Sequence, residues 1–319
     1  MMKILEYLGS FSVIWLVLWF CLSVMFVLVY PLIRNQIFRP HPRAGSLLLL
    51  SYWSAPALLS LISSVMLFMP GLDSLLVNAH CHADCAIHVP ILGSTLPAII
   101  GLSLAALVTV LLTSRLLLNL VVANRLQAQC KVMAQADKGY LVIEAVEPIV
   151  FTLGWWHPEI YASTGLINQT SQSDMEIMLC HESEHRRRRD NLRLLLARIF
   201  GVLLPAVFNR QLLDDVRLLT EQACDFKAAD QFGEVEVAET LLRMQRVLQG
   251  SALILPANAA AFLANEVEAR IAAVLNASAR QAFSREQLAG FGTVLAIFLL
   301  LTVEPLHHVA EWLITQLGR

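Results

Sequence analysis

Charged residues are scarce in this chain of 319 residues. Asp, Glu, Lys and Arg together make up 15% of it, whereas hydrophobic residues make up 57%, and the mean hydropathy is +0.62. A soluble domain usually carries about 25% charged residues. The composition therefore excludes an ordinary soluble globular protein and indicates helices that lie in a membrane.

Basic residues are too few for a nucleic-acid-binding surface. The formal net charge is −2, whereas a domain that binds nucleic acid is usually strongly basic. One basic run is present, four consecutive arginines at 186–189. At the end of a helix such a run more often pairs with acidic side chains or with anionic lipid headgroups. We therefore expect contact with membrane lipids and no direct binding of nucleic acid.

Four apolar stretches are long enough to cross a bilayer, whose hydrocarbon core needs about 20 helical residues. They run over about 11–33, 46–69, 91–112 and 288–305. A further apolar stretch, 194–208, is too short and too broken for a fifth span, so we expect it in the interface or packed against the membrane helices.

The stretches divide the chain into three parts. We expect a membrane domain over 1–118, a single α+β domain over 119–286, and a fourth membrane helix with a short external tail over 287–319. Lys and Arg concentrate in cytoplasmic loops. They follow the first and third stretches but are missing from 71–90. Both termini should therefore lie outside and the α+β domain in the cytoplasm.

Residues 181–185 read His-Glu-Ser-Glu-His, the pattern H-E-x-x-H, within a predicted helix. Residues four apart share one helical face, so His181 and His185 can bind one Zn²⁺. Glu182 then lies beside the metal, where a carboxylate can accept a proton from zinc-bound water. The spacing predicts a zinc hydrolase with Glu182 as its general base.

A third ligand is expected on a later helix. Glu221 would complete a His₂Glu set and leave the fourth position open. Asp225, one turn further on, is placed to accept the second N–H of a ligand histidine. Asp190, about one turn beyond His185, is also expected to be a partner of the site. Because this set is complete without sulfur, we interpret Cys224 as a small buried residue.

Longer blocks of the sequence resemble the membrane metallopeptidases of the BlaR1/MecR1 type, peptidase family M56. Residues 181–192 extend the H-E-x-x-H pattern through Asp190-Asn191-Leu192, and 154–166 match the family's "G…P.I…GL" segment. Residues 208–225 match "F-N…E-x-x-C-D", and 267–275 match the "R-I-x-x-L" helix shared with the M48 proteases. The matching blocks cover about 120–280.

This resemblance implies a fold, a location and an activity. The fold would be four transmembrane helices with a cytoplasmic, mostly α, gluzincin-like zinc metalloprotease domain between spans 3 and 4, in the bacterial inner membrane. It would hold one Zn²⁺ per chain and cleave a cytoplasmic repressor of the BlaI/MecI type, or itself, to derepress genes. A dimer is compatible with this. The alternatives are M48-like quality control and a non-catalytic scaffold with a structural zinc.

The best-known members of that family carry an external β-lactam-binding domain with an S-x-x-K nucleophile. This chain contains no S-x-x-K and ends at Arg319. We therefore expect no sensing of β-lactams by acylation.

Two features of the predicted site remain open in the sequence. The group that stabilises the oxyanion is not evident, and the candidates are Tyr161, His157 and Arg270. The strand predicted at 160–163 would lie at a sheet edge near the metal, where an edge can pair with a peptide backbone.

The loop between the second and third stretches has its own cluster of cysteine and histidine. Cys81 and Cys85 can form a disulfide, which an external loop permits, can be part of a metal-binding loop, or can do neither. The histidines that would take part in such a loop are His80, His82 and His88.

Overall fold

The computed structural model describes residues 2–69, 95–137, 139–201, 206–250 and 257–277, with isolated positions beyond. The predicted fourth span and tail lie outside the described residues. So do the start of the third span and the whole cysteine and histidine loop, with Cys81, Cys85, His80, His82 and His88.

Among the residues that the structure describes, three helices are long and apolar enough to cross a membrane. They are α1 (Met2–Phe38), α2 (Pro42–Phe68) and α4 (Thr95–Met133). α1 contains the predicted span at 11–33, α2 contains the predicted span at 46–69 up to residue 68, and α4 contains the predicted third span from residue 95 onward. At about 1.5 Å per residue each exceeds the roughly 30 Å hydrocarbon core, so the helices reach beyond it.

A small four-stranded sheet follows α4. Its strands are β1 (Gln135–Asp137), β2 (Tyr140–Ile143), β3 (Val150–Leu153) and β4 (Glu159–Ser163), in the order β1-β2-β4-β3. β2 and β4 are parallel and the other pairs are antiparallel. The prediction that 160–163 form an edge strand is wrong. β4 is an interior strand, and its neighbour β3 is an edge strand. The order depends on pairing between distant segments, which the local pattern of 160–163 does not contain.

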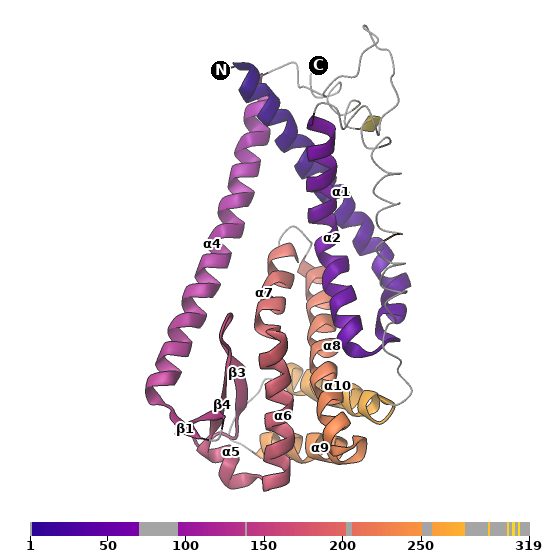
Figure 1. Cartoon of the computed structure of the whole chain (residues 1–319). Coiled ribbons are helices and arrows are strands. Elements are labelled where there is room, and N and C mark those ends of the chain that lie inside the picture. The colour runs from indigo at the N-terminus through magenta and orange to yellow at the C-terminus, as the bar shows by residue number, and fades with distance from the viewer. Residues whose placement is uncertain are drawn as a thin grey trace.

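The remaining elements are helices. They are α5 (Thr164–Gln169), α6 (Gln172–Arg188), α7 (Asp190–Phe200), α8 (Ala206–Phe232), α9 (Glu234–Gly250) and α10 (Ala257–Val274). Figure 1 shows α1, α2 and α4 diverging from one end of the molecule, with the sheet and α5, α6, α9 and α10 at the other. α7 and α8 run between the two ends, beside α2.

The contact between α8 and the membrane helices is apolar. Leu212, Val216 and Leu219 of α8 are buried against residues of α1 and α2, including Leu49 and Trp53. Of the apolar stretch at 194–208, Leu194 and Phe200 of α7 pack against the same cluster, so this described part of it has one of the two placements expected.

One buried carboxylate also joins α8 to α1. Asp215 accepts two hydrogen bonds from Arg34, each 2.7 Å long, and a third of 2.6 Å from the Tyr30 hydroxyl. Its side chain is 6% exposed and that of Arg34 is 38% exposed. Both carboxylate oxygens are therefore bonded to donors on α1.

Replacing Asp215 by Ala should loosen α8 from α1. The change leaves Arg34 and Tyr30 without their acceptor and should cost about 2 kcal/mol of stability, because Arg34 is partly open to solvent. Thermal unfolding of the full chain in detergent measures this. Asp214→Ala is the matched control, since Asp214 pairs with Arg217 at the surface. An equal loss in both variants would contradict this account of Asp215.

Candidate metal centre

Helix α6 carries the H-E-x-x-H residues and is fixed at both ends. Ser171 caps its start by accepting a hydrogen bond from the Asp174 amide, as serine often does at this position. Buried Asp174 also accepts hydrogen bonds from Thr240 and Arg243 of α9. At its other end Arg189 adopts a left-handed conformation with φ 54°. This turn lets α7 begin at Asp190, directly beside His185.

Side chains of α6 and α8 bring four possible ligand atoms together, the Nε2 atoms of His181 and His185 and both carboxylate oxygens of Glu221. The Nε2 atoms of His181 and His185 are 3.0 Å apart. Glu221 places one carboxylate oxygen 3.3 Å from the first and the other 3.4 Å from the second. Tetrahedral zinc with bonds near 2.05 Å needs ligand atoms about 3.3 Å apart. The donor set therefore fits zinc without rearrangement of the helices.

Each histidine is oriented by a carboxylate on its other nitrogen. His181 Nδ1 lies 2.9 Å from Asp225 Oδ1, and His185 Nδ1 lies 2.9 Å from Asp190 Oδ2. An Nδ1–H held in this way leaves Nε2 free as a lone-pair donor. These are the contacts expected from the spacing for Asp225 and Asp190.

Cys224 is closer to the histidines than the sequence indicated. His181, His185 and Cys224 form a group that can hold a metal ion, with one possible ligand atom from each residue within 4.8 Å of the others. The thiol donates to Asp190 Oδ2, the oxygen already bonded to His185 Nδ1. Its partner oxygen thus lies beside Nδ1 of His185, whereas the oxygens of Glu221 lie 3.3 and 3.4 Å from the Nε2 atoms. Both Cys224 and Glu221 are therefore candidates for a third ligand.

Arg270 pairs with two of the carboxylates at this site, Asp225 and Glu221. Arg270 donates to both oxygens of Asp225 at 2.7 and 2.8 Å and lies 3.1 Å from Glu221. Burial alone would raise the pKa of Glu221, but Arg270 and the two imidazoles outweigh it and hold that pKa well below its ordinary value. The carboxylate is thus kept ionised, as a metal ligand must be.

The pKa values of the two histidines move the other way. Burial alone would lower the pKa of His181 and His185, but the surrounding carboxylates, Asp225, Glu221 and Asp190, raise both, that of His185 furthest. The anions that favour a proton on these rings equally favour a divalent cation between them.

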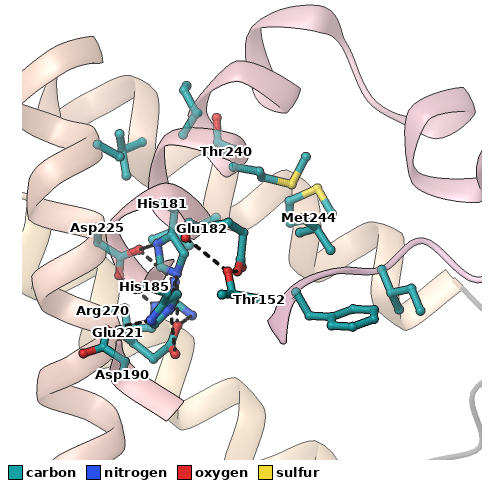
Figure 2. A pocket seen from close by; sticks show the side chains of 18 of the residues that line it. Thr152, His181, Glu182, His185, Asp190, Glu221, Asp225, Thr240, Met244 and Arg270 are labelled. Atoms are coloured by element: carbon teal, nitrogen blue, oxygen red, sulfur yellow. Dashed lines mark hydrogen bonds and ion pairs between the residues drawn. The ribbon is translucent and has the colours of Figure 1, made fainter. Parts of the chain in front are cut away.

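Glu182 points to the open side of the same cluster. Its side chain meets the Thr152 hydroxyl of β3, which lies 2.7 Å from Oε2 (Figure 2). Thr152 was not identified from the sequence because no short-range pattern links residues 30 positions apart. The structure brings His181, His185, Glu182, Glu221, Asp225 and Asp190 together, and adds Thr152 and Cys224.

All of these residues except Cys224 line one side of a cavity of about 460 Å³. The other side is apolar and is formed by β3, α6 and one face of α9, as Figure 2 shows for Met244. Its apolar lining residues include Ile149, Val150, Phe151, Met178, Val237, Leu241, Met244 and Leu248.

The structure does not favour the three oxyanion candidates. Tyr161 is fully buried on β4 and its hydroxyl donates to Glu159. Neither Tyr161 nor His157 is among the described residues that line the cavity. Arg270 does line it, but its guanidinium is engaged by Asp225 and Glu221. The sequence does not fix where these side chains point.

The arginines at 186–189 are mostly paired within the protein. Arg187 pairs with Glu184 and Arg188 with Asp190, while Arg186 donates to the Gly139 carbonyl. Pairing with acidic residues was one of the two uses expected for this run.

Comparison with protein-family models, with curated proteins and with solved structures found no match to this chain.

Proposed function

We propose that this chain is an integral membrane zinc endopeptidase. The observation that carries the proposal is the convergence of His181, His185 and Glu221, whose nearest ligand atoms lie 3.0–3.4 Å apart, close to the spacing of ligands around tetrahedral zinc. Three protein ligands with a cavity on the remaining side are typical of a catalytic site, whereas a structural zinc has four protein ligands.

A zinc ion held there would lower the pKa of a water molecule and polarise a peptide carbonyl. The remaining chemistry belongs to the chain's own residues. Glu182 borders the cavity and can accept the proton of a water molecule and later return it to the leaving amine. Thr152, by donating to Oε2, holds the carboxylate in one orientation.

The free edge of β3 supports a peptide as the substrate. Ile149 O accepts from Ser163 N, so the backbone groups of Ile149 point to β4. Because direction alternates along a strand, those of Val150 and Thr152 point away from β4. The Thr152 carbonyl already accepts from Asn191. The groups of Val150 remain directed along the cavity, where an extended peptide can pair with them.

Replacing Val150 by Pro should lower peptide cleavage about tenfold. The change removes an outward N–H from an edge strand and spares the ladder with β4, and loss of one hydrogen bond of about 1.4 kcal/mol is a tenfold effect. The measurement is kcat/KM for a fluorogenic peptide. Val150→Ala keeps the N–H and should retain most activity, so equal losses in the two variants would argue against backbone pairing.

For the substrate we propose a cytoplasmic transcriptional repressor of the BlaI/MecI type, or the chain itself, with the domain facing the cytoplasm of a bacterial inner membrane. The motifs at 154–166, 181–192, 208–225 and 267–275 support this through their resemblance to the M56 family. No S-x-x-K nucleophile is present, so the signal would not be β-lactam acylation.

The test is cleavage by the purified full chain in detergent. The substrates are the chain itself, a repressor encoded beside it and unfolded casein. Cleavage of the repressor at one position, with casein intact, supports a regulatory protease. Cleavage of casein and of many membrane proteins supports quality control of the M48 kind. Zinc bound without cleavage of any substrate would favour a scaffold.

A further inference from the structure

The end of α6 is held against the beginning of α2 by a buried arginine. Arg188 donates from Nη2 to the Ser46 hydroxyl at 2.9 Å and from Nε to Asp190 Oδ1 at 3.1 Å. Its side chain is 4% exposed and that of Asp190 is 3% exposed. Arg188 therefore bridges a membrane-spanning helix and the first residue of α7.

The bridge continues to a proposed metal ligand. Asp190 uses one oxygen for Arg188 and the other for His185 Nδ1, at 2.9 Å. The only other cation recorded beside Asp190 in the described part of the chain is Arg193, at 3.8 Å, beyond hydrogen-bond range. A continuous chain of direct contacts thus leads from Ser46 through Arg188 and Asp190 to the ring of His185.

A second contact between the same two helices does not involve the histidine side chains. Glu184 is 1% exposed, lies 3.3 Å from Arg43 Nε of α2, and accepts two hydrogen bonds of 2.7 Å from Arg187. This contact serves to join α2 and α6. Because it ends at Glu184, it offers a control for effects that come only from docking the helices together.

Burial of the Arg188 guanidinium at this position carries a free-energy cost. Its guanidinium is buried, and Nη1 has no hydrogen-bond partner. A buried charge with an unsatisfied donor is weak evidence for stability. A planar guanidinium, however, can donate to two acceptors in fixed directions, which an ammonium cannot do. The geometry therefore suits orientation of Asp190 more than stabilisation of the fold.

We propose that Arg188 is a positioning residue, which acts through Asp190 to fix the ring of His185 relative to the first turn of α2. This inference rests on the proposed function, because it treats His185 as a zinc ligand. A displacement of α2 relative to α6 breaks the bond between Ser46 and Arg188, and Asp190 then loses the group that holds it. The position of a membrane helix thereby sets the orientation of a metal ligand.

The experiment compares Arg188→Lys and Ser46→Ala with Arg43→Lys, the change in the second contact between α2 and α6, in the full chain in detergent. Zinc affinity is measured by competition with a chelator, and the absorption spectrum is recorded after loading with Co²⁺. We expect Arg188→Lys to weaken zinc binding about tenfold, the lower end of the effect of residues that orient metal ligands, and to alter the Co²⁺ spectrum. Arg43→Lys should change neither.

Ser46→Ala should reproduce part of this effect from the membrane helix. It removes one hydroxyl from α2 and no charge, so it also serves if Arg188→Lys fails to fold. In the double variant the losses should not add, because both changes break the same link. Additive losses, or equal losses in Arg43→Lys, would show that docking alone matters and would overturn the proposal.

The outcomes separate this inference from the proposed function. If the wild-type chain takes up neither Zn²⁺ nor Co²⁺, both fail. If the wild type binds zinc and cleaves peptide, while Arg188→Lys and Ser46→Ala match it in affinity and spectrum, only the positioning role is refuted.

Discussion

Replacing Glu182 by Gln is expected to abolish peptide cleavage while zinc stays bound. The amide keeps the size of the side chain and a hydrogen-bond partner for Thr152, but it cannot accept a proton at neutral pH. Loss of a general base typically slows a reaction by about 10²–10⁴-fold. Zinc should remain near one ion per chain, because Glu182 is not one of the proposed zinc ligands.

The measurements are zinc content by atomic spectroscopy and kcat for a peptide substrate. Glu176→Gln is the matched control, since Glu176 is an exposed residue on the same helix. It should retain wild-type values. Thr152→Val should lie between the two, because it removes the hydrogen bond that orients Glu182 but leaves the carboxylate. Full activity in Glu182→Gln would rule out the mechanism proposed here.

Replacing Glu221 by Ala is expected to remove zinc altogether. The change deletes the oxygens closest to both Nε2 atoms and leaves Arg270 with a single carboxylate partner. A buried cation without its counter-charge opposes the entry of another cation. Zinc affinity should therefore fall by more than the 10–100-fold typical of groups that only orient ligands, and cleavage should fall with it.

Cys224→Ala provides the comparison that identifies the ligand set. The thiol forms a group able to hold a metal with His181 and His185, but it donates to Asp190 Oδ2, the oxygen bonded to Nδ1 of His185, whereas Glu221 lies beside both Nε2 atoms. We expect the variant to keep its zinc and most of its activity. Loss of zinc in Cys224→Ala, with zinc retained in Glu221→Ala, would reverse the assignment and make sulfur the third ligand.

The sequence could predict the parts of this site that depend on helical spacing. His181 and His185 converge because four residues make about one turn, and Glu221 and Asp225 share a face for the same reason. The length and composition of α1, α2 and α4 likewise follow from local properties. Each of these predictions needs only residues that are near one another in the chain.

What escaped prediction depends on contacts between distant segments. The edge position of β3 requires β4 to pair with β2, which no pattern within 159–163 encodes. Thr152 reaches Glu182 only because that edge faces α6. Arg270 belongs to a helix 45 residues beyond Asp225, and its use as a counter-ion became visible only once α10 was placed beside α8.

The shared apolar contact between α8 and the membrane helices has a practical consequence. Leu212, Val216 and Leu219 are buried against α1 and α2, and Asp215 has its partners on α1. A fragment that begins at residue 119 would expose these apolar side chains to water and leave Asp215 without Arg34. The unit of folding is therefore larger than residues 119–286, and a fragment truncated at the membrane boundary should aggregate.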